Sequence, residues 1–190
     1  MWLFMCALVL LPGWVWAYTL TENDYATLKT DITVTHQAEF APAVANNDDQ
    51  FISDAYNQPS APTCWIWRTQ VPEKDNYQVT TDIPTTWNWD YFTGLQVPEQ
   101  NSWIRLWASG PLDASFQPNR DALPKIFKGN AAPQVTHVLA VWRRQALRGE
   151  TLYVTPQSGA CTTAVPAILT FIGYLRPIDV GHALRGVPLQ

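Results

Sequence analysis

The chain has 190 residues, of which 47% are hydrophobic and only 15% are charged, and its formal net charge is −4. This length is typical of one domain and is enough to bury a substantial core. The small negative charge excludes a strongly basic field of the kind that draws proteins to nucleic acid, so we expect no direct recognition of nucleic acid.

Ten tryptophans and fifteen prolines accompany this low charge. Charged residues usually make up about a quarter of a globular domain. Two interpretations stay open: a surface that packs against neighbouring molecules, or a tryptophan-rich core with many turns.

Residues 1–17 form an apolar segment, MWLFMCALVLLPGWVWA. Its apolar run, 3–11, is shorter than the roughly 20 residues that a spanning helix needs, so we expect no stable membrane anchor. The run resembles the core of a signal peptide, with Val15 and Ala17 as the small residues before a cleavage site. A signal peptide also has a positive start, yet no Lys or Arg precedes Lys29. The segment is interpreted either as a signal peptide or as a misassigned start, followed by a single domain over residues 18–190.

The first predicted helix begins at Thr21. Asp24 lies three residues later and completes a variant of the capping box, while Leu20 and Tyr25 occupy the positions of a hydrophobic staple. Pro42 marks the latest point at which this helix is expected to end.

The middle of the chain predicts several short elements. A helix is expected from Asp48, and the apolar run 64–67 is compatible with strand or helix. Pro72 begins a short helix, and residues 78–86 are predicted to form a loop. Pro98 begins another helix, whose packed face carries Trp103, Leu106 and Trp107.

Two further helices are predicted towards the C-terminus. One is short, spans about 123–127 and carries Pro124 in its first turn. The other begins at Pro133 and carries an apolar stripe that continues to Ala146, before Gly149 ends it. A basic cluster at its end is expected to face the negative end of the helix dipole rather than to bind phosphate. This cluster consists of Arg143, Arg144 and Arg148.

The last part of the chain changes character. Residues 155–166 are small and polar, residues 168–174 form the best strand candidate, and residues 178–184 are predicted to form a short helix. The expected fold is therefore mainly α: a compact multi-helix domain with a small β element near the C-terminus.

The three cysteines are Cys6, Cys64 and Cys161, and none forms a CxxC pair. Zinc and thioredoxin-like sites are therefore poorly supported. If residues 1–17 are removed, Cys64 and Cys161 remain and can pair in an oxidising compartment. The default expectation is two unpaired thiols.

No arrangement of residues predicts chemistry. His36, His137 and His182 lack partners at metal-ligand spacing, and His137 is expected on a helix surface. The acidic residues Asp48, Asp49, Glu73 and Asp75 are expected at helix starts rather than as paired acid and base catalysts. We predict no catalytic, cofactor-binding or metal-binding residue, no cofactor, and a protein that is not an enzyme.

The tryptophans allow either a stacking platform for sugars or bases, or a filled core with a few interface anchors. Stacking on bases usually requires a positive groove, which the net charge does not favour. The residues concerned are Trp65, Trp67, Trp87, Trp89, Trp103, Trp107 and Trp142.

Several motifs follow one another in a recognisable order. They are CWIWRTQVP (64–72), TTWNW (85–89), EQNSW (99–103), and NR followed by IF (119–127), with TLT to LKTDI (19–32) and DAYN (54–57) upstream and TLY (151–153) and AVPAILTF (164–171) downstream. Over residues 19–180 the chain resembles a family of small proteins encoded in the structural-gene region of tailed bacteriophages and prophages. Residues 1–17 fall outside the family pattern, and residues 157–163 depart from its Gly-Thr-rich version.

This resemblance implies a non-enzymatic structural protein of a tailed phage particle, at the head–tail junction or in the tail. Its partners would be other phage structural proteins in a symmetric assembly, and its location the virion. The family carries no catalytic residues to transfer. The alternative is a secreted or periplasmic binding module, with residues 1–17 as a signal peptide and the tryptophans as a ligand platform.

Overall fold

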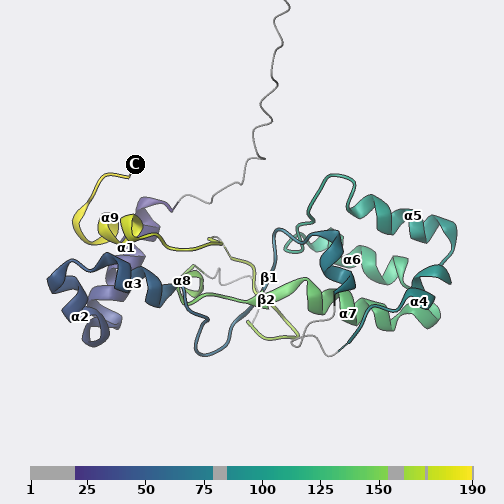
Figure 1. The fold of residues 1–190 in the computed structure, drawn as a ribbon, viewed down its shortest axis with the longest axis horizontal. Helices are drawn as coiled ribbons and strands as arrows, with labels where there is room; N and C mark the ends of the chain where they lie inside the picture. The colour runs from purple at the N-terminus through teal and green to yellow at the C-terminus, as the bar shows by residue number, and fades with distance from the viewer. Residues whose placement is uncertain (1–19, 79–84, 154–160, 170, 190) are drawn as a thin grey trace, which may run out of the picture.

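The computed structural model describes residues 20–78, 85–153, 161–169 and 171–189, so the apolar segment 1–17 lies outside the described residues. The molecule is elongated, with a helical lobe at each end and a narrow neck between them (Figure 1). The prediction of a mainly α fold is confirmed. The small β element lies in the neck rather than near the C-terminus, which corrects its predicted position.

The terminal lobe combines the two ends of the described chain. Its helices are α1 (Glu22–Thr30), the π-helix η1 (Asp31–Thr35), α2 (Gln37–Asn46), α3 (Asp49–Tyr56) and α9 (Pro177–Arg185). Helix α9 packs against both α1 and α3. Its buried core is rich in aliphatic residues and tyrosine.

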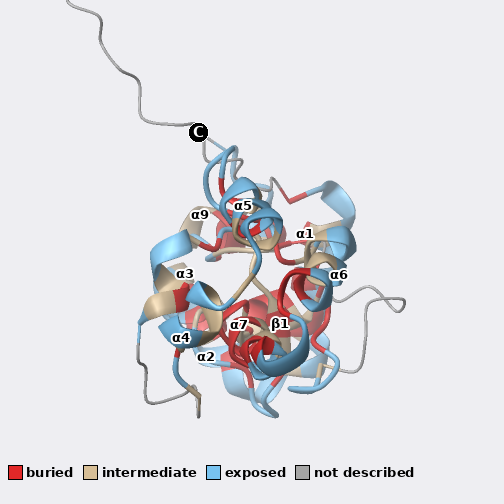
Figure 2. Ribbon diagram, turned by 90° about the vertical axis from the view of Figure 1, so that its right-hand side faces the viewer, coloured by how far each residue is buried: buried red, intermediate tan, exposed pale blue. Residues whose placement is uncertain are grey.

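The tryptophan lobe is formed by the middle of the chain. It contains the 3-10 helices η2 (Glu73–Tyr77) and η3 (Gly129–Ala131), and the α-helices α4 (Trp89–Thr93), α5 (Val97–Leu106), α6 (Gln117–Ile126) and α7 (Pro133–Val141). Figure 2 looks at the molecule from this end and shows buried residues enclosed by exposed helix faces. The lobe has its own core, separate from that of the terminal lobe.

The neck joins the lobes through three passes of the chain. Strand β1 (Trp65–Trp67) pairs antiparallel with β2 (Arg143–Gln145), and segment 161–169 lies along the other edge of β1. Ala167 accepts a hydrogen bond from the Trp67 amide (3.1 Å) and donates one to the Trp65 carbonyl (2.8 Å). The short helix α8 (Arg148–Thr151) leads back towards the terminal lobe and contacts α3.

The predicted start of the first helix is confirmed. Thr21 is the N-cap of α1; its hydroxyl accepts from the Asp24 amide (3.3 Å), and the Asp24 carboxylate accepts from the Thr21 amide (2.8 Å). These bonds satisfy backbone groups that a helix start otherwise leaves unpaired. Leu20 and Tyr25 are buried together in the terminal core, as the staple requires.

Two prolines occupy other positions relative to their helices than predicted. The first helix already changes direction near His36, where the π-helix ends, so Pro42 falls within the new helix α2, which buried Phe40 anchors in the core. Helix α6 begins earlier than predicted, at Gln117, so Pro124 lies near its end and not in its first turn.

The helix that begins at Pro133 ends earlier than predicted. Helix α7 stops at Val141, and the chain then extends into β2, where the Trp142 carbonyl accepts from the Arg68 amide (2.9 Å). The basic cluster therefore does not end this helix: Arg143 and Arg144 lie in β2 and Arg148 begins α8. The apolar stripe of the sequence extends past the end of the helix because two later residues are also buried. Trp142 is buried in the core of the tryptophan lobe, and Ala146 is buried in the neck.

The predicted strand over 168–174 is wrong for the described part of that segment. The segment makes only isolated bridging contacts near Ala167, and Phe171 and Leu175 then turn into the terminal core. The last predicted helix is confirmed as α9. No helix in the described ranges has the length and apolar character needed to cross a membrane.

Candidate interaction site at the neck

The structure divides the candidate platform tryptophans into core and surface residues. Trp103 and Trp142 are fully buried, and Trp87 and Trp107 are nearly so. They pack mostly edge to face with their aromatic neighbours. Trp103 contacts Trp87, Trp107 and Phe127, and Trp107 contacts Trp142, with ring centroids between 5.3 and 6.1 Å apart. The interpretation that most tryptophans fill a core is confirmed for these residues.

Trp89 belongs to the surface group. Its side chain is 54% exposed and stacks on Tyr77, with ring centroids 5.0 Å apart. The Tyr77 hydroxyl donates to Glu73 (2.7 Å) and accepts from Trp103 (3.2 Å). Burial, followed by the hydrogen bond to Glu73, raises the pKa of Tyr77 to about 12. Trp89 thus covers one edge of the aromatic core.

Trp65 and Trp67 lie on the outer face of the neck, and Trp67 also packs against the core of the tryptophan lobe. Successive side chains of a strand point to opposite faces, so these two share one face while Ile66 points into the neck core. Their neighbours on β2 are Gln145 and Arg143. All four side chains of this face are half-buried.

An arginine guanidinium lies over the ring of each of the two neck tryptophans. Arg120 lies over the ring of Trp67, 4.6 Å from its centroid, and Arg143 lies 5.4 Å from the centroid of Trp65. Such contacts between a cation and a ring fix both partners. Arg120 also donates to the Ser115 carbonyl (2.7 Å) and to the Ala114 carbonyl. Burial lowers the pKa of Arg120.

Two cavities of about 560 Å³ each flank this face. The first is lined by Trp67, α6, α7 and residues 164–168. The second is lined by Trp65, residues 60–64, α8 and residues 161–163. Between them Arg143 donates a hydrogen bond to the Thr163 carbonyl. Segment 161–168 therefore forms one wall of both cavities.

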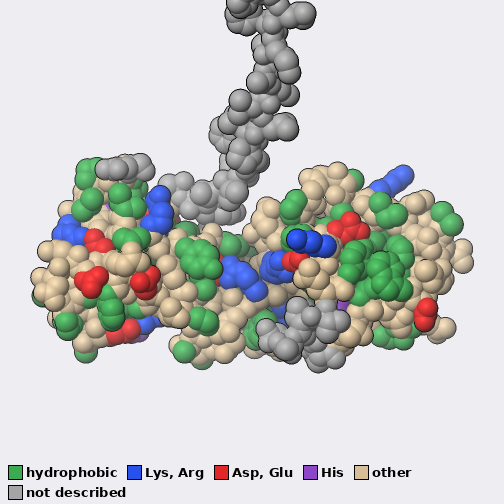
Figure 3. Space-filling model, in the orientation of Figure 1, with side chains coloured by type: hydrophobic (Ala, Val, Ile, Leu, Met, Phe, Trp, Pro, Cys, Tyr) green, Lys and Arg blue, Asp and Glu red, His purple; other side chains and the backbone are tan. Residues whose placement is uncertain are grey.

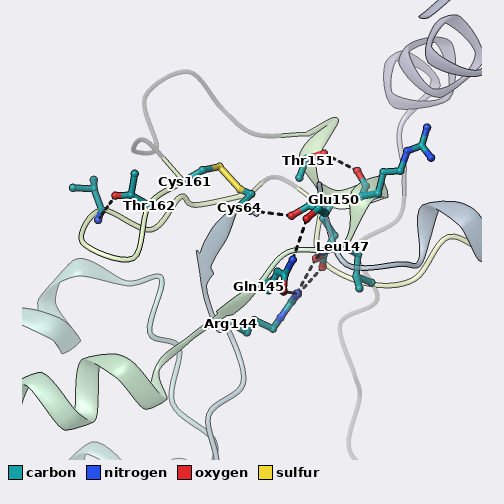
Figure 4. The surroundings of a disulfide bond; sticks show 11 residues. Cys64, Arg144, Gln145, Leu147, Glu150, Thr151, Cys161 and Thr162 are labelled. Atoms are coloured by element: carbon teal, nitrogen blue, oxygen red, sulfur yellow. Dashed lines mark hydrogen bonds and ion pairs between the residues drawn. A yellow bond between two sulfur atoms is a disulfide. The ribbon is translucent and has the colours of Figure 1, made fainter. Parts of the chain in front are cut away.

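A buried ion pair supports the neck from behind. The Glu150 carboxylate is fully buried and accepts two hydrogen bonds from Arg144 (2.6 and 2.8 Å), as Figure 4 shows. It also accepts from the amides of Leu147 (2.8 Å) and Gly173 (2.9 Å). A buried carboxylate needs such complete pairing, and here the pairing joins β2, α8 and the chain that returns to the terminal lobe.

A disulfide between Cys64 and Cys161 closes the neck (Figure 4). The default expectation of two unpaired thiols is therefore wrong, and the alternative of pairing is correct. Cys64 precedes β1, and the Cys161 carbonyl accepts from the Trp65 amide (2.8 Å). The bond thus joins the point where the chain enters the tryptophan lobe to the segment that walls both cavities.

The histidines have structural contacts. His137 is 1% exposed, which corrects its predicted place on a helix surface; its ring nitrogens lie 2.8 Å from the Asn76 carbonyl and 3.1 Å from the Thr85 hydroxyl. His36 contacts Asp31 (3.0 Å) and His182 contacts the Val187 carbonyl (2.8 Å). Within the described ranges, no three His, Cys, Asp or Glu side chains are grouped as metal ligands.

The acidic residues predicted at helix starts occupy such positions. Asp48 caps α3 by accepting from the Phe51 amide (3.0 Å), and Asp49 pairs with Arg185. In η2, Glu73 and Asp75 lie in the first turn, and Asp75 also pairs with Arg68 (2.6 Å).

No family model, no curated protein and no solved structure matches the chain. The outer face of the neck combines two half-buried indole rings, polar side chains and two cavities, an arrangement suited to binding. No binding residues were predicted from the sequence. The pattern WIW at 65–67 is the one local signal for this face, because a strand would place both tryptophans on the same side.

Proposed function

We propose that the protein is a non-enzymatic structural component of a tailed phage particle, at the head–tail junction or in the tail. The motifs over residues 19–180 that resemble a phage structural-region family support this proposal. Its partners are then other phage structural proteins in a symmetric assembly, and its location is the virion.

The observation that carries this proposal is the construction of the molecule from two separately cored lobes joined by a clamped neck (Figure 1). An elongated subunit presents surfaces that lie far apart on the same chain. Contacts between different surfaces of neighbouring copies generate rings when the rotation closes. Head–tail and tail components need such ring contacts, with a modest interface repeated around the axis.

Apolar side chains on the outside of the tryptophan lobe provide one such surface. Val97 and Ile104 lie seven residues apart on α5, hence on one side of the helix, and are 67% and 56% exposed. Trp89 on α4 is also exposed. Figure 3 shows a hydrophobic patch on this lobe. Exposed apolar surface of this kind is typical of a protein contact.

Mass spectrometry of purified particles after prophage induction tests the proposal directly. We expect peptides from residues 18–190 in the particles. The double variant Val97→Asp/Ile104→Asp is expected to stay folded and to lose incorporation, whereas Val34→Asp, an equally exposed change on the terminal lobe, serves as the matched control. Absence of the wild-type protein from particles contradicts the proposal.

The disulfide favours a second candidate, an exported binding module with an aromatic ligand platform. Disulfides form and persist mainly in oxidising compartments, and Cys64 and Cys161 are paired. This candidate predicts a periplasmic or secreted chain that begins at Tyr18. Cell fractionation with N-terminal sequencing and thiol labelling tests it, and free Cys64 and Cys161 in protein from the native host would argue against it.

A further inference from the structure

The outer face of the neck has the composition of a ligand site. Trp65 and Trp67 line different cavities, each within the range of about 300–1,000 Å³ that is usual for ligand sites. We propose that this face binds a neutral oligosaccharide, with one sugar ring against each tryptophan. This inference goes beyond a role in assembly. For the second candidate function, an exported binding module, it names the class of ligand that the tryptophans would bind.

Trp65 and Trp67 are two residues apart on strand β1. Residues two apart on a strand point to the same side and lie about 6.6 Å apart along it. That distance is on the scale of neighbouring rings in an extended sugar chain. A sugar ring has an apolar C–H face that suits the flat surface of an indole. Trp65 and Trp67 lie on the same side of β1, one beside each cavity, and an arginine lies over each ring.

Polar groups surround both rings. Hydroxyl groups both donate and accept hydrogen bonds, which suits the hydroxyls of a sugar. The rim of the cavity at Trp67 carries three polar side chains that are linked in a chain of hydrogen bonds, from Arg120 to Gln117 and from Gln117 to Asp121. The cavity at Trp65 carries the hydroxyls of Ser60, Thr63, Thr151, Thr162 and Thr163.

The charges at the neck favour a neutral ligand over an anionic one. Arg120 and Arg143 are engaged by backbone carbonyls, and Arg148 is paired with Glu39 (2.6 and 2.7 Å). The carboxylate of Asp121 lies on the rim of the cavity at Trp67. A phosphate chain or an acidic peptide would meet this carboxylate and a net charge of −4.

The site is held in shape before any ligand arrives. Arg120 and Arg143 fix the two rings, and the disulfide at Cys161 fixes the segment that walls both cavities. A preformed site loses little conformational freedom on binding, so more of the contact energy contributes to affinity.

Binding of defined sugars to the oxidised full chain tests the inference. Cellotetraose, maltotetraose and chitotetraose are titrated by calorimetry, and we expect at least one to bind. Trp65→Ala and Trp67→Ala should each weaken that binding about tenfold. Trp89→Ala, an exposed tryptophan outside the neck, should leave it unchanged, and near-ultraviolet circular dichroism monitors the fold of every variant.

Conservative variants separate a lost contact from a lost fold. Trp65→Phe and Trp67→Phe keep an aromatic surface and should bind within about threefold of the wild type. Failure of all three sugars to bind overturns the inference, as does binding restricted to oligodeoxythymidylate or polyglutamate run in parallel. A loss in Trp89→Ala but not in the neck variants overturns the location. Presence in phage particles is measured independently, so either proposal can fail alone.

Discussion

The two lobes differ in what holds them together. In the terminal lobe, buried carboxylates accept hydrogen bonds from other helices: the Tyr56 hydroxyl donates to Asp31 (2.5 Å), and the Tyr25 hydroxyl of α1 donates to Asp179 of α9 (3.3 Å). Asp179 also accepts from Arg176 at the start of its own helix (2.8 Å). In the tryptophan lobe, ring contacts dominate and the buried polar bonds are neutral. Asn76 is the centre of these, since its side-chain oxygen accepts from the indole of Trp142 (3.0 Å) and its carbonyl meets His137.

The lobes also differ in how the chain builds them. The core of the terminal lobe joins residues from 20–56 to Tyr153 and to residues from 171–183, whereas the buried core of the tryptophan lobe comes from the single stretch 71–142. Contacts between distant segments require a large loop to close before they form. We conclude that the terminal lobe depends on charge and on both ends of the chain, and that the tryptophan lobe depends on local packing of rings.

Removal of the disulfide should have the largest effect. Cys64 and Cys161 are 97 residues apart, and a loop of that length stabilises by about 4–5 kcal/mol in the chain-entropy model. The tryptophan lobe lies inside the loop and most of the terminal lobe lies outside it. Urea unfolding of Cys64→Ser/Cys161→Ser, followed by tryptophan fluorescence, should therefore show an earlier transition of the tryptophan lobe. An unchanged midpoint contradicts this account.

Trp142→Ala should cost the tryptophan lobe about 4 kcal/mol. The side chain is fully buried, so its removal leaves a cavity and strands the amide oxygen of Asn76. Equilibrium urea unfolding measures the loss. Trp89→Ala, which truncates a ring that is 54% exposed, is the matched control and should cost less than about 1 kcal/mol. Equal losses in the two variants would refute a core formed by the buried rings.

Acid should weaken the terminal lobe before the tryptophan lobe. Burial opposes ionisation of Asp179, but hydrogen bonds from Arg176 outweigh it and lower the pKa below its ordinary value of 3.8; a hydrogen bond from Arg148 likewise lowers the pKa of Glu39 below 4.5. Stability from such carboxylates is present above their unfolded pKa and is lost as pH falls through the folded one.

The loss should therefore occur below about pH 4 and amount to about 1–2 kcal/mol for Asp179, given its partly exposed partner. Hydrogen exchange of α9 amides against α5 amides, compared at pH 5 and pH 3 after correction for intrinsic rates, measures it. In Asp179→Asn the difference between the helices should shrink. A tryptophan lobe that opens first in acid would reverse the comparison.

Thr21→Ala should have the smallest effect, about 1 kcal/mol. It removes the hydroxyl that accepts from the Asp24 amide at the start of α1. Because α1 packs on α9, faster exchange is expected in both helices and not in the tryptophan lobe. Thr21→Ser keeps the hydroxyl and should retain wild-type protection; protection lost equally in both lobes would show that they do not open separately.

Local signals in the sequence were enough to predict several elements. Thr21 and Asp24 specify the start of α1 through their own hydrogen bonds, and the spacing of Trp103 and Trp107 specifies the buried face of α5. These signals are short-range, so they need no knowledge of the rest of the fold. The position of Asp48 as the cap of α3 is of the same kind.

Other features depend on contacts between distant residues and could not be predicted. Trp142 continues the apolar stripe of α7 in sequence, but its carbonyl pairs with Arg68, 74 residues earlier, and this pairing ends the helix. The bond between Cys64 and Cys161, the burial of Glu150 and the separation of core from surface tryptophans likewise require the assembled neck. Trp65 and Trp67 could be named from the sequence as candidate platform residues, but the cavities beside them form only where three chain passes meet.

The pairing of Arg68 with Trp142 has a consequence for how such a chain can change. The tryptophan lobe leaves and re-enters the neck at adjacent backbone positions, so it is, in genetic terms, an insertion with neighbouring ends. A segment of that kind can be excised, replaced by a tight turn or transplanted into another host protein with little disturbance of the rest. The tryptophan lobe is thus the natural unit of exchange in this molecule. Any protein that replaced this lobe would still need the terminal lobe and the disulfide-closed neck.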